Sequence, residues 1–294
     1  MKETMENEKS WCNILRRMTA VLLFGLVTVF TIGLTAGAQE KTDEDMNILL
    51  IGTDHRDDSW NGNSDTMILV TIREDCGSIM MTSFMRDLYA DIPGCGVHKL
   101  NYAFAAGGAE KLMETLEDNY DLSIDHYAVV DFESMAEIVD IVGGVDMTIS
   151  DGECKWLNGY LNSMEAWEDY LPGGGSYTLN GNQAVAYARI RYVGNNDYQR
   201  TQRQRDILKQ IFKKVQGLDA DQLASLAKDV IPEVEHDYNA LEMLGLLAKL
   251  PTIAGYDLEE ERIPYDDLYY SQNEMLVPDF EATRARLHEA LGIQ

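Results

Sequence analysis

The chain has few cysteines, few prolines and few basic residues, and each scarcity narrows what it can be. Of its 294 residues only 4 are Cys and 6 are Pro, and 24 Lys and Arg face 50 Asp and Glu, so the formal net charge is −26. An acidic excess of this size argues against non-specific binding of nucleic acid. The cysteine spacings match no zinc pattern and indicate no catalytic nucleophile. No linker rich in Pro, Gly or Ser is evident, and no internal repeat.

One long apolar run stands near the beginning of the chain. Residues 18–38 carry no charge and are long enough to cross a bilayer, which takes about 20 residues. Lys9, Arg16 and Arg17 precede the run and acidic residues follow it, which predicts a cytoplasmic N-terminus at 1–17, a transmembrane signal anchor at 18–38 and a short linker at 39–45. The alternative is a cleaved signal peptide ending near Ala38. Under both readings residues 46–294 lie outside the cytoplasm.

The exterior part, 46–294, is long enough for one α/β domain or two small ones. The best candidate boundary is near Gly217, because residues 217–294 contain 17 acids and 5 Lys or Arg and are helical in pattern. We expect this acidic part to form an outer helical layer of the same domain. A helical face that would be buried is predicted for Leu241, Leu244, Leu247 and Ala248. The exterior cysteines, Cys76, Cys95 and Cys154, allow one disulfide or none.

Three short strands are predicted to bring charged residues to one edge of a sheet. The runs 47–52, 66–72 and 78–84 read as strands, and a turn signal joins the last two, so these two pair antiparallel. If the first two strands are also antiparallel neighbours, Asp54, Asp65 and Arg86 converge. Two carboxylates and an arginine suit Mg²⁺ with a phosphate, because Mg²⁺ uses one or two carboxylates and takes its other oxygens from water and substrate.

The following segments predict a layered α/β fold with helices covering the sheet. Strands are expected at 127–131 and 145–149 and helices at 102–117 and 135–142, with Asn101 as the N-cap of the helix at 102. Residues 151–175 are rich in aromatic and turn residues. We expect a loop there, which is either a flexible rim over a lipid or glycan groove or a segment packed on the surface.

A basic segment interrupts this acidic chain. Residues 181–216 hold eight Lys or Arg and two acids. If residues 189–191 are extended, Arg189 and Arg191 point to the same side. A helix is predicted from about residue 198 to 215, and its spacing places Arg200 and Gln204 on the inward stripe near the helix N-terminus, where an anion is favoured. Guanidinium groups bind phosphate oxygens in pairs, so this cluster indicates a phosphate-rich ligand. Arg203 and Arg205 are intermediate between inward and outward positions, and Lys99 could neutralise phosphate or be solvated.

Taken in order, these residues resemble the LytR-CpsA-Psr family over roughly 47–215. The elements are Leu-Leu-Ile-Gly-Thr-Asp-His-Arg at 49–56, Ser-Asp-Thr-Met at 64–67, Arg86-Asp87, Lys-Leu-Asn at 99–101, Gly-Gly-Val at 143–145, Leu-Asn-Gly at 179–181 with Gln183-Ala184, Arg-Ile-Arg at 189–191, and Asp197 with Arg200, Arg203 and Gln204. Two departures are Asn63, where the family usually has Arg, and Phe84-Met85, where Ile-Pro is common. Neither removes a predicted metal or phosphate ligand.

The resemblance implies a three-layer α/β/α arrangement around a mixed β-sheet and a phosphotransferase of the Gram-positive cell membrane. Such an enzyme moves a glycopolymer, wall teichoic acid or capsule, from a polyprenyl pyrophosphate carrier onto peptidoglycan as a phosphodiester during cell wall biogenesis. Asp54 and Asp65 would then hold Mg²⁺, with Mn²⁺ as an alternative. The residues implied to hold the pyrophosphate are Arg86, Arg189, Arg191 and Arg200, supported by Lys99, Gln204 and Arg203. The lipid tail would occupy an apolar groove between sheet and helices.

Two other functions would use the same residues. A hydrolase would cut the lipid pyrophosphate with water, and only dependence on the acceptor distinguishes it from a transferase. A non-catalytic envelope scaffold would bind the glycolipid without turnover. A transcriptional attenuator fits poorly, because the basic segment lies outside the membrane and no helix-turn-helix pattern is present. The glycopolymer carried, the acceptor atom, the general base and the oligomeric state do not follow from the sequence.

Overall fold

The computed structural model of the chain describes residues 45–53 and 62–293. The predicted membrane segment at 18–38 and the predicted metal ligand Asp54 lie outside these residues. Within them, no helix combines the length and the apolar character needed to cross a bilayer. The residues from Asp45 onward form one compact unit.

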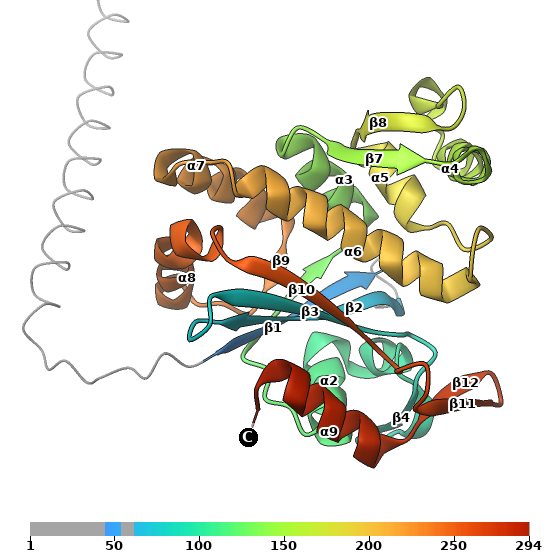
Figure 1. Cartoon of the computed structure of the whole chain (residues 1–294), viewed down its shortest axis with the longest axis vertical. Coiled ribbons are helices and arrows are strands. Elements are labelled where there is room, and N and C mark those ends of the chain that lie inside the picture. Colours follow the sequence, from blue (N-terminus) through green and yellow to red (C-terminus); the bar gives the residue numbers. More distant parts are fainter. Residues whose placement is uncertain (1–44, 54–61, 294) are drawn as a thin grey trace, which may run out of the picture. The chain divides into compact units, whose positions relative to one another are not determined.

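The domain is organised by a six-stranded mixed sheet (Figure 1). Its order is β10-β3-β2-β1-β6-β9. The strands are β1 (Met46–Thr53), β2 (Ser64–Arg73), β3 (Ser78–Phe84), β6 (His126–Val130), β9 (Glu235–His236) and β10 (Asp257–Ile263). The antiparallel pairings of β1 with β2 and of β2 with β3 confirm the prediction, whereas β6 and β10 join the sheet parallel to β1 and β3. β3 is buried at every residue, since both faces of the sheet are covered there.

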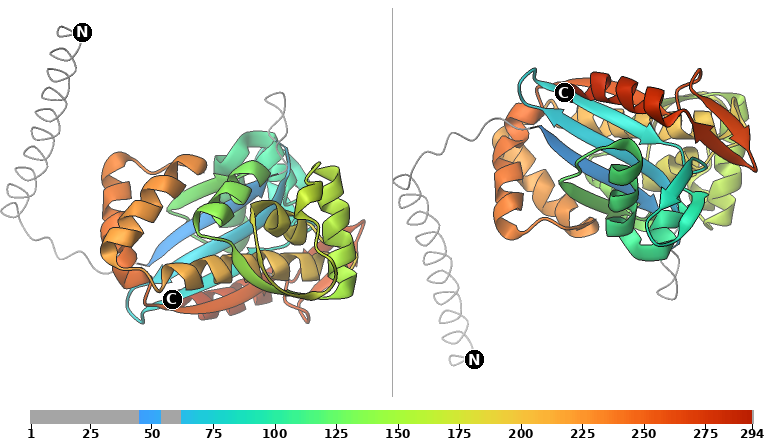
Figure 2. Two further views of the ribbon diagram at one scale, coloured as in Figure 1. Left: turned by 90° about the horizontal axis from the view of Figure 1, so that it is seen from above. Right: turned by 90° about the horizontal axis from the view of Figure 1, so that it is seen from below.

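Helices cover both faces of the sheet (Figures 1 and 2). On one face, α2 (Tyr102–Tyr120) and α9 (Phe280–Leu291) pack onto Leu49, Met67 and Phe84. On the other face lie α3 (Phe132–Ile141), α5 (Gly181–Ala188) and α6 (Asn196–Val215). The strands alternate side chains between the two faces, so neighbouring residues such as Ile48 and Leu49 enter different apolar clusters.

The remaining elements extend these layers. They are β4 (Tyr89–Ile92), β5 (Gly96–Lys99), β7 (Val145–Ile149), α4 (Asp151–Ser163), η2 (Trp167–Asp169), β8 (Gly175–Leu179), α7 (Ala220–Val230), η3 (Ile231–Glu233), α8 (Ala240–Ile253), β11 (Tyr269–Gln272) and β12 (Met275–Pro278). The predicted strand at 145–149 is β7, but it pairs antiparallel with β8 in a separate two-stranded sheet. Asn101 precedes α2 as expected, although its side chain makes no capping hydrogen bond.

The prediction of a loop at 151–175 was wrong, because half of the segment is the helix α4. Ser150 and Glu153 form a reciprocal capping box that starts it: the Glu153 backbone N–H donates to the Ser150 side chain, and the Glu153 carboxylate accepts from the Ser150 backbone N–H. Leu157 and Leu161 then anchor α4 in an apolar cluster shared with α5 and the β7–β8 sheet. Residues 151–163 are therefore a packed helix and not a loop.

The acidic C-terminal part differs from the predicted outer helical layer in two ways. It supplies both edge strands of the main sheet, β9 and β10. It also contains the expected helix α8, but Leu241 and Leu244 are 79% and 56% exposed. The helix instead packs through Leu246 and Ile253, which contact the apolar end of β2 and β3. Which face of α8 is buried depends on that contact, and the spacing of apolar residues in the sequence does not reveal it.

Candidate functional site

The site begins where β2 starts and β3 ends. Asp65 is the second residue of β2, and Arg86 follows β3 by two residues. Because these strands are antiparallel, their ends meet, and Arg86 Nη1 donates a hydrogen bond of 2.7 Å to Asp65 Oδ1. The predicted convergence is confirmed for this pair. The third predicted member, Asp54, lies outside the described residues.

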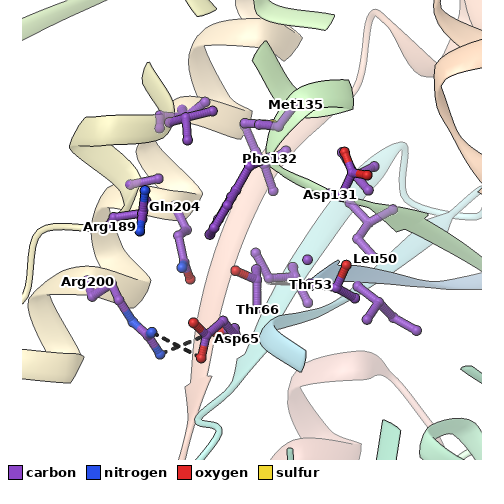
Figure 3. A pocket seen from close by; sticks show the side chains of 18 of the residues that line it. Leu50, Thr53, Asp65, Thr66, Asp131, Phe132, Met135, Arg189, Arg200 and Gln204 are labelled. Carbon is purple, nitrogen blue, oxygen red and sulfur yellow. Dashed lines mark hydrogen bonds and ion pairs between the residues drawn. The ribbon is translucent and has the colours of Figure 1, made fainter. Parts of the chain in front are cut away.

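Two further arginines reach the same carboxylate, Arg200 from α6 and Arg191 from the segment that follows α5, and Figure 3 shows the contact of Arg200. Arg200 lies in the first turns of α6, and its Nη1 is 3.5 Å from Asp65 Oδ1 while its Nη2 donates to the Asp65 backbone carbonyl at 3.2 Å. Arg191 Nη2 donates to Asp65 Oδ2 at 3.3 Å. Arg200 is only 2% exposed, which confirms that it belongs to the inward stripe of α6. Asp65 is thus surrounded by guanidinium groups from three segments.

Asp197 is a member of this site to which the sequence analysis assigned no role. It accepts a hydrogen bond of 3.1 Å from Arg200 Nη2, one helical turn along α6, and its carboxylate is 3.5 Å from Arg86 Nε. It therefore holds Arg86 and Arg200 against each other despite their like charge. The spacing of three residues between Asp197 and Arg200 was the available signal, since such pairs share a helix face.

The electrostatics favour an anion. Burial by itself raises the pKa of Asp65, but Arg200, Arg86 and Arg191 together hold that pKa below its usual value, so the carboxylate is ionised at neutral pH. Burial lowers the pKa of Arg200 despite its partner Asp197. Burial also works against the charge of Arg86, yet Asp197 and Asp65 raise its pKa overall. Asp87, 3.8 Å from Arg86, is a third carboxylate of the cluster and pairs with Lys99 at 2.9 Å, so four cationic side chains face three carboxylates in a partly desolvated place.

Several polar atoms here have no hydrogen-bond partner. Among the described residues, ten buried side-chain N or O atoms make no hydrogen bond, and three of them belong to this cluster: Arg86 Nε, Asp197 Oδ1 and Arg200 Nε. Buried polar groups normally find partners, so such a concentration indicates groups kept for a ligand.

Behind the charged cluster lies an apolar cavity of about 320 Å³ between the sheet and the helices of one face (Figure 3). Its apolar wall includes Leu50, Ile68, Val130, Phe132, Met135, Val185, Ala188, Ile207 and Leu208. Its polar lining is Asp65, Asp131, Arg189, Arg191, Arg200 and Gln204, together with Thr53 and Thr66. The arrangement can hold a molecule with an apolar part inside and an anionic group at the arginines.

Arg189 also lines the cavity, but its backbone conformation differs from the one expected. The premise of an extended 189–191 segment was wrong, since Arg189 caps the C-terminus of α5 in a helical conformation with φ −87° and ψ −10°. Its guanidinium carbon is 4.7 Å from the ring centre of Phe132 and 4.9 Å from that of Tyr160. These cation–π contacts fix the side chain at the wall of the cavity. Arg189 and Arg191 nevertheless line the same space, as the sequence predicted.

Three predicted substrate-binding residues lie outside the cavity lining: Arg86, which is described above, Lys99 and Arg203. Lys99 Nζ is 2.9 Å from Asp87 Oδ1, and Asp87 lies 3.8 Å from Arg86 Nε, so Lys99 reaches the cluster through Asp87. Arg203 is 1% exposed and donates to Glu153 and to the backbone carbonyls of Ile190 and Val193. Its donors are used within the protein, so we reassign Arg203 from the substrate to the loop that carries Arg191.

The predicted metal ligands can be examined only in part. Within residues 45–53 and 62–293 there is no group of three or more His, Cys, Asp or Glu that could hold a metal ion. Asp65 alone of the predicted pair is described. Cys76, Cys95 and Cys154 are free thiols, which rules out the single disulfide that the sequence left open.

The sequence and the fold of this chain are similar to those of known proteins. The sequence profile of the LytR_cpsA_psr family matches residues 29–289. Biofilm regulatory protein A of Streptococcus mutans is 31% identical over 286 residues, which cover 89% of this chain and 68% of the relative. The polyisoprenyl-teichoic acid–peptidoglycan teichoic acid transferase TagU of Enterococcus faecalis is 35% identical over 181 residues, 60% of this chain and 56% of the relative.

A solved structure shares the fold. The Bacillus subtilis protein TagT, solved with bound octaprenyl pyrophosphate lipid, superposes with a TM-score of 0.64 and covers 87% of this chain and 95% of that structure. At 23% identity this likeness concerns the fold alone. A mixed sheet flanked by helices is therefore common to both molecules.

Proposed function

This chain belongs to the LytR-CpsA-Psr family, and we propose that it transfers an anionic glycopolymer from a polyprenyl pyrophosphate carrier onto peptidoglycan as a phosphodiester. The observation that carries the proposal is the junction of an apolar cavity with a cluster of guanidinium groups. A polyprenyl pyrophosphate is complementary to this site, because it joins an apolar chain to a compact anion. The names of relatives support the same substrate class, since the protein from E. faecalis is called a polyisoprenyl-teichoic acid–peptidoglycan teichoic acid transferase.

The proposed roles follow from position. Arg189, Arg191 and Arg200 line the cavity and would bind the pyrophosphate oxygens, with Gln204 on the same lining. Arg86 would act from the end of β3, and Lys99 would support it through Asp87. The prenyl chain would extend along Ile68, Phe132 and Ile207. Burial strengthens these interactions, because fewer waters compete for the phosphate oxygens.

The reaction requires little covalent chemistry from the protein. A sugar hydroxyl of peptidoglycan attacks the phosphorus attached to the glycan, the bond from that phosphorus to the bridging oxygen breaks, and polyprenyl phosphate leaves and takes up the proton that the hydroxyl loses. Negative charge grows on the leaving phosphate, where arginine donors stabilise it. The apolar wall keeps the carrier in place and excludes water from the inner side of the pyrophosphate.

The types of ligand atom present would suit a magnesium ion. Asp65 is an ionised carboxylate, and Asp197 Oδ1 is a buried oxygen without a hydrogen-bond partner, so the donors are the hard oxygens that Mg²⁺ prefers. With Asp54 they would hold the ion, and substrate oxygens would complete its shell. Bound there, Mg²⁺ would supply neutralising charge to the pyrophosphate. We further propose that residues 18–38 anchor the chain in the cell membrane and that the domain works outside.

The test uses the full chain in detergent with an octaprenyl pyrophosphate-linked disaccharide, Mg²⁺ and uncrosslinked peptidoglycan chains, with products detected by mass. The proposal predicts a glycan-phosphate–peptidoglycan adduct that is lost with Arg86→Ala. Arg286→Ala is the matched control, since Arg286 is an exposed arginine paired with Asp267. Release of glycan phosphate without acceptor would instead indicate a hydrolase, and tight binding without any product would indicate a scaffold.

A further inference from the structure

Two exposed aromatic residues are close along the chain to residues that line the cavity: Tyr192 follows Arg191, and Trp156 is one helical turn before Tyr160. Tyr192 is 63% exposed and Trp156 is 38% exposed, and their ring centres are 4.5 Å apart with planes inclined by 34°. Single exposed aromatic residues are ordinary on protein surfaces. A contacting pair that leaves wide ring faces to solvent, immediately next to an arginine of the site, needs a more specific explanation.

The pair is held in place by the buried Arg203. Its Nη1 donates to the Ile190 carbonyl at 3.1 Å and its Nη2 to the Val193 carbonyl at 3.0 Å. These carbonyls flank Arg191 and Tyr192, so both ends of the short segment are fixed. Arg191 reaches the carboxylate of Asp65 while Tyr192 remains largely in solvent. The exposed ring is therefore presented by an anchored segment.

The second ring, that of Trp156, belongs to a face of α4 that also contacts Arg203 and Arg189. Glu153 Oε1 accepts a 3.0 Å hydrogen bond from Arg203 Nε, Trp156 contacts Tyr192, and Tyr160 packs on Arg189. Residues three and four apart share a helix face, so these three contacts form one line along α4 that ends at the cavity. The aromatic pair is thus continuous with the lining of the proposed pyrophosphate site.

We propose that Trp156 and Tyr192 form a platform for the sugar that is joined to the pyrophosphate of the donor. This inference rests on the proposed function. A pyrophosphate held by Arg191 places its attached sugar just outside the cavity, and Tyr192 is the next residue, about 3.8 Å further along the chain. Aromatic ring faces carry negative charge and suit the C–H face of a sugar ring. Tyr and Trp also offer a large rigid surface at small entropic cost while the sugar hydroxyls stay in water.

The test compares two ligands by calorimetry on the full chain in detergent micelles. One is octaprenyl pyrophosphate, and the other is the same lipid carrying one sugar, used as three separate probes with glucose, galactose or N-acetylglucosamine. For at least one sugar, the unmodified chain should bind the glycosylated lipid more tightly than the bare one. Tyr192→Ala and Trp156→Ala should each weaken that glycosylated lipid about tenfold, the usual scale for removing a central aromatic contact, and leave the bare lipid unchanged.

Two controls separate stacking from other effects. Tyr192→Phe keeps the ring and should bind as the unmodified chain does. Tyr270→Ala removes a comparably exposed tyrosine, 59% exposed on β11, and should change neither affinity. The platform is refuted if the two aromatic variants weaken bare and glycosylated lipid equally, which would indicate disturbed positioning of Arg191. It is refuted equally if both ligands bind the unmodified chain and neither variant alters either affinity.

Two other outcomes have different meanings. If the aromatic variants keep both donor affinities but raise the KM for peptidoglycan chains in the transfer assay, the surface binds the acceptor and the assignment to the donor is wrong. If the unmodified chain binds neither lipid, the proposed function itself fails. The experiment therefore distinguishes an error in the role of the aromatic pair from an error in the proposed function.

Discussion

The position of Asp65 among three arginines leads to a prediction about its charge. The carboxylate occupies the guanidinium groups that we assign to the pyrophosphate, at 2.7 Å from Arg86, 3.3 Å from Arg191 and 3.5 Å from Arg200. In the absence of Mg²⁺ it should repel the ligand and compete for its partners. Replacing it by the neutral isostere, Asp65→Asn, should then tighten the binding of octaprenyl pyrophosphate.

The magnitude follows from the geometry. A phosphate oxygen that shares these arginines would lie on the order of 5 Å from the Asp65 carboxylate, given ordinary hydrogen-bond lengths. At an effective dielectric constant of about 20, two unit charges at that distance repel by about 3 kcal/mol. The Asp65 side chain is 21% exposed, so solvent and salt reduce this value. We expect an increase in affinity of about tenfold to a hundredfold without Mg²⁺.

With Mg²⁺ present, the unmodified chain should bind octaprenyl pyrophosphate more tightly than Asp65→Asn does. If Asp65 is a ligand of the ion, the unmodified chain gains affinity when Mg²⁺ is added and the Asn variant gains little. Calorimetric titration of the full chain in detergent, with EDTA and then with Mg²⁺, measures both effects. Asp267→Asn is the matched control, since Asp267 is an exposed acid paired with Arg286. Weaker binding by Asp65→Asn in EDTA would refute the reasoning, because the carboxylate would then matter mainly for holding the arginines in place.

Three further predictions concern the frame of the site. Arg200→Lys keeps the charge but loses the planar fork, so calorimetry should show affinity for octaprenyl pyrophosphate falling about tenfold or more. Gly181→Ala would place a Cβ 2.2 Å from the Ala136 carbonyl oxygen, and thermal unfolding should show a loss of about 2 kcal/mol or more, whereas Gly159→Ala, in open space on α4, should gain about 0.5 to 1 kcal/mol. For Glu153, burial raises the pKa but hydrogen bonds from Ser150 and Arg203 lower it below 4.5 overall, so its stabilisation is present above pH 4.5 and lost as pH falls through the lowered value. Glu153→Gln should thus be less stable than the unmodified chain at pH 7 and converge with it in acid unfolding curves; a difference that persists at low pH would contradict this.

The elements that the sequence predicted best are those with local signals. The three strands around Asp65 have unbroken apolar runs and a clear turn, and antiparallel pairing then determines which ends meet. The helix that carries Arg200 shows its inward stripe through Ile207, which is fully buried. For these parts, the local pattern and the tertiary structure favour the same conformation. The convergence of Asp65 with Arg86 could therefore be derived from the sequence.

The elements that were missed depend on contacts between distant residues. Arg203 looks like a substrate ligand in a basic segment, but its role is decided by Glu153, fifty residues earlier. The capping box of Ser150 and Glu153 was readable, yet the glycines and aromatic residues that follow suggested a loop. In α8, two leucine faces were available, and only packing on the end of the sheet selects Leu246 over Leu244.

The most direct test of the central claim follows one atom. The donor is octaprenyl pyrophosphate-linked disaccharide with ³²P at the phosphorus next to the sugar, incubated with the full chain, Mg²⁺ and uncrosslinked peptidoglycan chains. The account predicts that the label moves into peptidoglycan together with the disaccharide and that unlabelled octaprenyl phosphate is released. Label that appears as soluble disaccharide phosphate whether or not peptidoglycan is present, or label that stays in the lipid, would contradict it.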